Sequence, residues 1–258
     1  LRVESGCREI VLTGIHLGLY GADLQDITLA SLVRQFQDAV PGLLRLRLSS
    51  IEPSDLTPEL VEALVGSDLV CPHLHIPLQS GDDEILRMMN RPYESVEYLY
   101  LAKWLKQEIP GLALSTDLIV GFPGETECHH RRSMALVEEI GFSSLHVFKY
   151  SARPGTPAAS LPAHLPNIIK DQRSGEMIKL GDQLSAAYRR QFFGTTQPVL
   201  VEKVFPYQHA EGFTPHYLRV KISMAIKGLH WKEKEIRARI LDNEGPGLMA
   251  EPAPRYDI

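Results

Sequence analysis

The first 150 residues repeat one pattern, in which a short apolar run is followed by a polar loop and then by an amphipathic stretch. The apolar runs predict strands at 8–13, 43–48, 72–76, 112–120 and 145–148. Helical spacing of apolar residues predicts helices at 28–40, 57–65, 82–89, 95–107 and 127–140, with Thr57 and Thr126 as N-caps. Because a helix separates most strands from the next, the strands should run parallel, as in a complete or partial α/β barrel or a doubly wound sheet.

A different pattern follows a long predicted helix at 167–192. Short β-rich runs separated by turns occur at 198–205, 211–214, 217–222 and 236–241, which is typical of a small β-barrel. We therefore predict two domains, an α/β core at 1–194 and a β-barrel at 195–258.

Composition narrows the class of protein. The chain has 258 residues, of which 44% are hydrophobic and 23% charged, as in ordinary globular domains. We find neither a secretory signal nor an apolar run of the roughly 20 residues needed to span a membrane, so a cytoplasmic protein is expected. The net charge is −5, yet 197–240 carries eight Lys or Arg against four Asp or Glu. This segment is either a polyanion-binding surface or a solvated strand face.

Polar and Gly-rich segments follow every predicted strand of the α/β region. Since the carboxyl ends of parallel strands meet at one edge, these segments should form one composite site. They lie at 13–18, 49–53, 79–81, 121–126 and 150–156.

Several single residues are candidates for chemistry. His73 and His75 share one side of a strand, and Asp117 interrupts the most apolar strand, so each faces a site or is satisfied structurally. Arg153, in a rigid Pro-Gly turn, would bind an anion or form a surface ion pair. By contrast, Cys128 and the two histidines after it are helix neighbours that point about 100° apart and cannot converge on one metal ion.

Six segments, in order, carry a family resemblance: 9–21 (EIVLTGIHLGLYG), 46–53 (LRLSSIEP), 73–81 (HLHIPLQSG), 89–93 (MNRPY), 117–126 (DLIVGFPGET) and 148–158 (FKYSARPGTPA). Together they resemble the methylthiotransferase family of radical S-adenosylmethionine enzymes. The tail segment 210–220 (AEGFTPHYLRV) is similar to the small RNA-binding β-barrel, of the TRAM type, that ends those proteins. The resemblance implies an incomplete radical-SAM-type parallel α/β barrel followed by this all-β module.

The resemblance also implies a reaction. Enzymes of this family use S-adenosylmethionine and 4Fe-4S clusters to form a 2-methylthio adenosine in tRNA. The tail is most similar to the branch that modifies threonylcarbamoyladenosine beside the anticodon, whereas 148–158 also resembles the isopentenyladenosine branch. The expected partner is the tRNA anticodon stem-loop, the expected state is a monomer, and the sulfur donor is unknown.

Matching positions carry the implied binding sites. Thr13 and Gly14 would contact the amino-acid end of S-adenosylmethionine, Ser49 and Gln79 its ribose or carboxylate, and the strand from Asp117 to Gly121 its adenine. The implied RNA-binding cations are Arg153, Lys203, Arg219, Lys221, Lys227, Lys232, Lys234, Arg237 and Arg239. Phe213 and Tyr217 are expected either to stack on bases or to belong to the module's core.

One departure from the family is decisive for activity. The CxxxCxxC triad that binds the radical-forming cluster is absent, and the three cysteines, Cys7, Cys71 and Cys128, are far apart in sequence. We therefore expect a C-terminal part of the enzyme that lacks the N-terminal cluster domain and loads no cluster alone. The alternatives are a non-catalytic tRNA-binding remnant and an unrelated barrel enzyme acting on a small phosphorylated metabolite.

Overall fold

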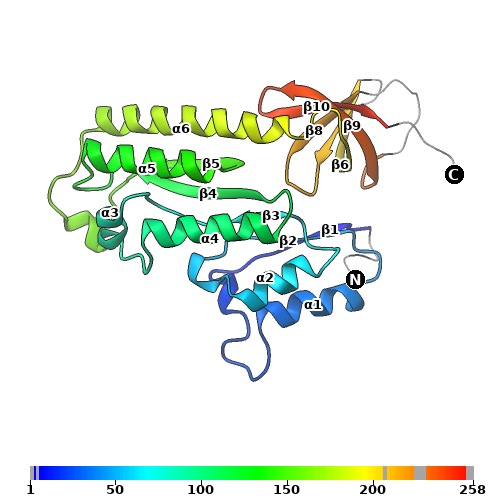
Figure 1. The fold of residues 1–258 in the computed structure, drawn as a ribbon, viewed down its shortest axis with the longest axis horizontal. Coiled ribbons are helices and arrows are strands. Elements are labelled where there is room, and N and C mark those ends of the chain that lie inside the picture. The colour runs from blue at the N-terminus through cyan, green and yellow to red at the C-terminus, as the bar shows by residue number, and fades with distance from the viewer. Residues whose placement is uncertain (1–2, 4–5, 206–207, 224–230, 254–258) are drawn as a thin grey trace.

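Five parallel strands lie side by side in chain order in a computed structural model of the chain, which describes residues 3, 6–205, 208–223 and 231–253 (Figure 1). They are β1 (Glu9–Leu12), β2 (Arg45–Leu48), β3 (His73–His75), β4 (Ala113–Val120) and β5 (Ser144–Lys149). The pair β1–β2 and the sheet β3–β4–β5 are joined by two isolated parallel bridges, Leu46 to Val70 and Ser50 to His75. Within the described residues β1 pairs only with β2, so the sheet is an open part of a barrel.

Helices cover one face of this sheet, and most of them pack against a neighbouring helix (Figure 1). They are α1 (Leu29–Ala39), α2 (Pro58–Val65), α3 (Asp83–Met88), α4 (Ser95–Glu108), α5 (Glu127–Ile140) and α6 (Asn167–Arg190), with 3-10 turns at Leu17–Leu19, Pro53–Asp55 and Pro157–Ser160. The hydroxyls of Thr57 and Thr126 accept hydrogen bonds from backbone N–H groups of the first helical turn, which confirms both predicted N-caps.

The two faces of the sheet differ in chemistry because side chains alternate along each strand. The face toward the helices is apolar and belongs to the main core, through Leu48, Leu74, Ile76, Leu114, Leu118 and Val120. The opposite, concave face is rich in polar residues, namely Glu9, Arg45, Arg47, His73, His75, Ser115, Asp117, Ser144 and His146. A barrel interior that carries this many polar side chains is suited to bind polar groups.

The C-terminal part is a closed five-stranded barrel in the order β10-β8-β7-β6-β9, which confirms the predicted all-β module. Its strands are β6 (Thr196–Phe205), β7 (His209–Phe213), β8 (Arg219–Ser223), β9 (Glu235–Glu244) and β10 (Gly247–Pro252). A Cβ atom on Gly212 would lie 2.0 Å from the Leu200 carbonyl oxygen, so only glycine fits where β7 crosses the bulge of β6. The sequence analysis missed β10, whose segment begins with Gly and ends with Pro.

Two arginines of β2 join the β-barrel to the sheet. The Arg45 guanidinium binds Glu235 at 2.8 Å and donates to the carbonyls of Phe213 at 2.6 Å and Pro198 at 3.1 Å. The Arg47 guanidinium binds Glu9 at 2.7 Å and donates to the carbonyls of Pro215 at 2.7 Å and Thr214 at 2.9 Å. Both arginines are only 2% exposed. Buried charges are tolerated only when they are paired and hydrogen-bonded, and both of these are.

Other contacts of the same junction surround the arginines. The Tyr217 ring lies 4.6 Å from the Arg47 guanidinium and 5.0 Å from the His73 ring. The Tyr188 hydroxyl at the end of α6 donates to the Gly111 carbonyl at 2.7 Å. The tail segment 210–220 therefore contributes its 213–217 turn to the junction between the two parts.

Replacing Arg45 tests the strength of this junction. We expect Arg45→Met to lower the free energy of unfolding in urea by at least about 2 kcal/mol, because Glu235 and two carbonyls lose a charged donor. The matched control is Arg34→Met, whose exposed ion pair with Glu59 should contribute no more than about 1 kcal/mol. Equal effects of the two variants would contradict the assignment.

Candidate functional site

The polar loops predicted from the sequence lie at the carboxyl edge of the sheet, as expected. Thr13 and Gly14 follow β1 and are exposed, and Ser49 follows β2, where its N–H donates to the Leu12 carbonyl at 2.9 Å. Gln79 lies beyond β3 at a φ of +65°, and its N–H donates to the Asp117 carbonyl at 2.9 Å. Parallel register thus brings residues far apart in sequence to one edge.

The 121–126 loop after β4 is held by a buried ion pair. Gly121 has a φ of +74°, and its N–H donates to Glu125 Oε2 at 2.6 Å. Glu125 Oε2 also binds Arg173 of α6 at 2.6 Å, and both side chains are buried. The sequence analysis missed this pair, since nothing local to either residue indicates that α6 returns over the loop.

The junction divides the concave face into two halves. Near the start of the strands, Arg45, Arg47 and Ala113 are buried beneath the β-barrel. Toward the carboxyl ends the face is open: Val11 and Phe148 are each 52% exposed and His146 is also exposed. Any ligand of the concave face must therefore bind in the open half.

Asp117 lies in the open half between two histidines. Its Oδ1 is 3.3 Å from His75 Nε2 and 3.2 Å from His146 Nδ1. Burial raises the pKa of Asp117, but hydrogen bonds and charge from the two histidines outweigh it and hold the pKa below its ordinary value. Asp117 thus faces a cluster of side chains and not a loop backbone. The sequence analysis named His75 and Asp117 but missed His146, which the parallel register of β4 and β5 places opposite Asp117.

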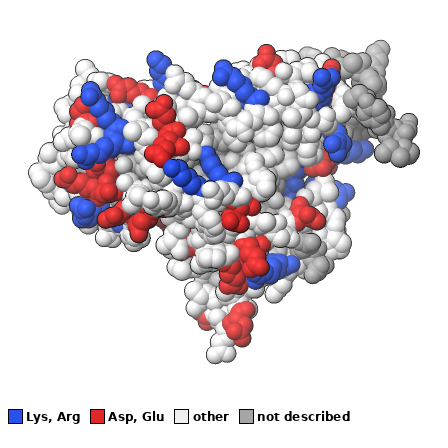
Figure 2. Space-filling view, viewed as in Figure 1, with Lys and Arg blue, Asp and Glu red and all other residues white. Residues whose placement is uncertain are grey.

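The predicted RNA-binding residues belong to several surfaces. Lys203 on β6 and Arg219 on β8 are exposed, and Lys221 on β8 is half-buried. Arg219 binds Glu211 at 2.6 Å, so acidic and basic groups mix there. Arg153 is exposed on the loop after β5, whereas Lys227 lies outside the described residues. Figure 2, viewed as Figure 1, shows acidic and basic side chains mixed over the helical end of the molecule and several basic side chains along the β-barrel end.

Phe213 and Tyr217 stack on each other with ring centroids 5.0 Å apart. Tyr217 is 51% exposed, although its ring also contacts Arg47 and His73. Their position at the junction gives both rings a structural role and leaves base stacking as a prediction for the exposed part of Tyr217.

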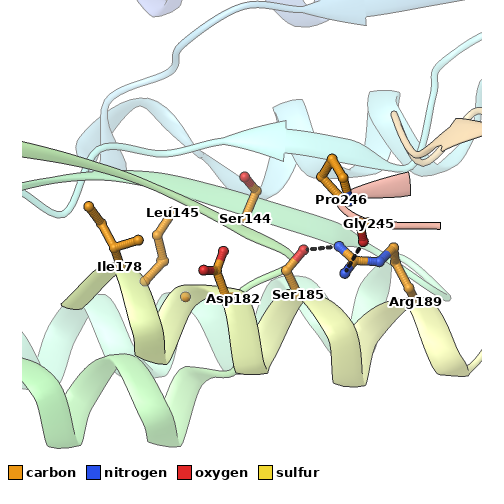
Figure 3. A pocket seen from close by; sticks show the side chains of 9 residues that line it. Ser144, Leu145, Ile178, Asp182, Ser185, Arg189, Gly245 and Pro246 are labelled. Carbon is orange, nitrogen blue, oxygen red and sulfur yellow. Dashed lines mark hydrogen bonds between the residues drawn. The ribbon is translucent and has the colours of Figure 1, made fainter. Parts of the chain in front are cut away.

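A separate cavity of about 540 Å³ lies between α6, the start of β5 and the β9–β10 turn (Figure 3). Arg189 donates to Ser185 Oγ at 2.7 Å and to Asn243 Oδ1 at 3.0 Å, which ties α6 to β9. The cavity lies away from the carboxyl-edge loops and is distinct from the composite site. Its lining residues are Ser144, Leu145, Ile178, Gly181, Asp182, Ser185, Arg189, Gly245 and Pro246.

The three cysteines do not fit an iron–sulfur cluster. Cys71 is buried, and burial raises the pKa of its thiol to about 11, whereas Cys128 is exposed on α5. Cys7 donates to the Glu9 carbonyl beside β1. A cluster needs several thiolates around one centre, and among the described residues no cysteine belongs to a group of potential metal ligands.

Comparison with known proteins identifies the family. Residues 1–137, more than half of the chain, match the family model described as the Radical SAM superfamily. The chain belongs to the radical SAM superfamily. Within the described residues, no helix combines the length and apolarity needed to cross a membrane.

Curated relatives are similar over nearly the whole chain. It is 40% identical over 94% of its length to "Threonylcarbamoyladenosine tRNA methylthiotransferase MtaB" of Bacillus subtilis, and 35% identical over 94% to the protein of that name from Thermotoga maritima. It is 39% identical over 78% of its length to "tRNA-2-methylthio-N(6)-dimethylallyladenosine synthase" of Clostridium botulinum. The chain spans about half the length of these relatives, covering 55%, 55% and 44% of them.

Solved structures agree with the fold. Coproporphyrinogen III oxidase (HemN) from Escherichia coli, a radical SAM enzyme, aligns with a TM-score of 0.54 at 20% identity, over 69% of this chain and 40% of that chain. The radical S-adenosylmethionine methyltransferase TsrM from Kitasatospora setae aligns with a TM-score of 0.50 at 20% identity, over 61% and 31%. At this identity the likeness supports the barrel fold alone.

A half-buried histidine makes the junction sensitive to acid. Burial, with the nearby Arg47 and Arg45 guanidiniums, lowers the pKa of His216 from 6.5 to about 4. Because the unfolded state binds this proton more readily, stability is lost as the pH falls below 6.5. We expect up to about 2 kcal/mol of loss between pH 7 and pH 5 from this residue.

Urea unfolding at several pH values checks this prediction. His216→Leu should reduce the dependence of the unfolding free energy on pH between 7 and 5 without abolishing it, because burial also lowers the pKa of His73 at this junction to about 3. His164→Leu, on an exposed loop, should leave the dependence unchanged. A slope that His216→Leu does not alter would show that the junction titrates through other groups.

Proposed function

We propose that this chain forms the barrel core and the RNA-binding module of a tRNA methylthiotransferase. In this proposal residues 1–194 are the radical SAM core, residues 195–258 are a TRAM-like module, and the protein acts in the cytoplasm. Its substrate is adenosine beside the anticodon, modified at N6, and its product carries a 2-methylthio group.

The observation that carries the proposal is an alignment that includes both parts of the chain. Relatives with this printed activity match 94% of the chain, through the β-barrel as well as the sheet. A shared core alone would support radical chemistry of any kind. The basic segment at 197–240 supplies exposed cations, such as Lys203, that suit a phosphate backbone.

The carboxyl-edge residues have defined roles in this proposal. Thr13, Gly14, Ser49 and Gln79 would contact S-adenosylmethionine, while the end of β4 up to Gly121 would lie along its adenine. When bound, this cofactor supplies a radical after cleavage at a cluster. The cysteines of this chain do not fit that cluster, so this chain alone orients cofactor and RNA but does not start the reaction.

The threonylcarbamoyl derivative is the favoured substrate, because the relatives named for it match 94% of the chain and the dimethylallyl relative matches 78%. A non-catalytic tRNA-binding role is the second candidate, and the three separate cysteines favour it. The third alternative, an unrelated barrel enzyme for a small phosphorylated metabolite, is set aside by the superfamily match.

Nucleoside analysis of tRNA tests the proposed function. Deleting the gene in the source cells should remove 2-methylthio-N6-threonylcarbamoyladenosine from digested tRNA, as measured by mass spectrometry, while N6-threonylcarbamoyladenosine accumulates. The native gene restores the methylthio nucleoside.

Three results would contradict parts of the proposal. Loss of the methylthio group from the dimethylallyl nucleoside would assign the other branch. An unchanged nucleoside profile, with tRNA binding by the purified chain intact, would favour the non-catalytic role. An unchanged profile with no salt-dependent tRNA binding would reject the function altogether.

A further inference from the structure

Three ligand-type atoms converge in the open half of the concave face. His75 Nε2, Asp117 Oδ1 and His146 Nδ1 come from the neighbouring strands β3, β4 and β5, and all lie within 4.8 Å of one another. Among the described residues, this is the group of His, Cys, Asp and Glu side chains placed to hold a metal ion. Each residue is fixed by the strand register, since His75 pairs with Ser115 and Asp117 pairs with His146.

Two of the three separations between these atoms equal the distance between neighbouring ligands of a tetrahedral metal ion. Asp117 Oδ1 lies 3.3 Å from His75 Nε2 and 3.2 Å from His146 Nδ1. Ligands about 2.0–2.1 Å from a tetrahedral ion are separated from one another by about 3.3 Å. The two imidazoles are also stacked, with ring centroids 5.4 Å apart and an interplanar angle of 26°. The third pair of atoms, His75 Nε2 and His146 Nδ1, lies within 4.8 Å.

Ser115 supports the ligand orientation of His75. Its Oγ lies 3.0 Å from His75 Nδ1 and 3.4 Å from the Leu74 carbonyl oxygen. When a metal ion replaces the proton on Nε2, the Ser115 hydroxyl can donate to that carbonyl and accept the Nδ1–H of His75, which leaves the Nε2 lone pair directed at the ion. Partners of this kind fix the tautomer of histidines that bind metals.

We propose that His75, Asp117 and His146 bind one divalent transition-metal ion, with its remaining positions open toward the concave face. Two imidazoles and one carboxylate are a donor set that Zn²⁺ and non-haem Fe²⁺ accept. Because His75 is largely buried and His146 is exposed, the open positions face solvent. An oxygen-bearing ligand could bind the ion there. The site does not involve the three cysteines, but it uses Asp117, the first residue of the strand segment assigned above to the adenine of S-adenosylmethionine, so it shares the open half with the proposed cofactor site.

Metal titration of the purified full chain tests the site, after treatment with a chelator. We expect isothermal titration with Zn²⁺ to show one site per chain, and Co²⁺ to give the visible absorption of a bound ion with nitrogen ligands. Mg²⁺ should not compete, since it prefers oxygen ligands. Asp117→Asn and His146→Ala should each weaken Zn²⁺ binding at least about tenfold. Removing a residue that hydrogen-bonds to a metal ligand already lowers metal affinity by about that factor, and removing the ligand itself should lower it no less.

Matched controls separate the site from other histidines. His164→Ala and His209→Ala remove histidines from the loop before α6 and from the β-barrel, and should leave Zn²⁺ affinity unchanged. Circular dichroism verifies that each variant is folded, and Asp117→Asn keeps the side-chain size if His146→Ala does not fold. Absence of Zn²⁺ binding, or binding that survives both ligand variants, would overturn the proposal. The three side chains would then be joined by hydrogen bonds alone.

Discussion

The burial of two guanidinium groups, those of Arg45 and Arg47, is the constraint on which the arrangement of the whole molecule depends. Removing a positive charge from water is costly unless its donors find acceptors. Here Glu9 and Glu235 neutralise the charges, and backbone carbonyls of the β-barrel accept hydrogen bonds from the remaining N–H groups. Neither part of the chain supplies all of these acceptors. The sheet and the β-barrel therefore stabilise each other.

This junction determines where chemistry is possible. The β-barrel covers the start of the strands and leaves the carboxyl half of the concave face open. In that half lie the edge loops and the cluster around Asp117, while the buried Glu125–Arg173 pair holds the 121–126 loop. Because the junction fixes the β-barrel relative to the open half of the concave face, an RNA bound to the β-barrel would meet that open half in a constant orientation. The proposed tRNA modification requires that geometry.

Much of the fold could be predicted from the sequence because local signals set its elements. Alternating apolar runs located the five parallel strands, and Thr57 and Thr126 located helix starts through capping. The edge loops were predictable because parallel strands share one carboxyl edge. By contrast, β10 was missed because its Gly and Pro ends mask a strand whose pairing is supplied by β8 and β9.

Long-range partners were the part that the sequence could not indicate. His146 joins Asp117 through the register of two strands, and Arg173 reaches Glu125 only because α6 returns over the loop. The sequence left open whether Phe213 and Tyr217 stack on bases or belong to the core of the module, and gave no sign that the backbone carbonyls of the 213–217 turn accept hydrogen bonds from buried arginines. A local pattern shows which residues are unusual, but tertiary packing decides what they contact.

Hydrogen exchange followed by mass spectrometry tests the central claim most directly. If the arginines hold the two parts together, peptides covering 213–217 and 45–48 exchange slowly in the native chain. Replacing both Arg45 and Arg47 by Met should accelerate exchange there while the distant α5 keeps its protection. Rapid exchange of the 213–217 turn in the native chain, or no change on replacement, would contradict this account of how the molecule is assembled.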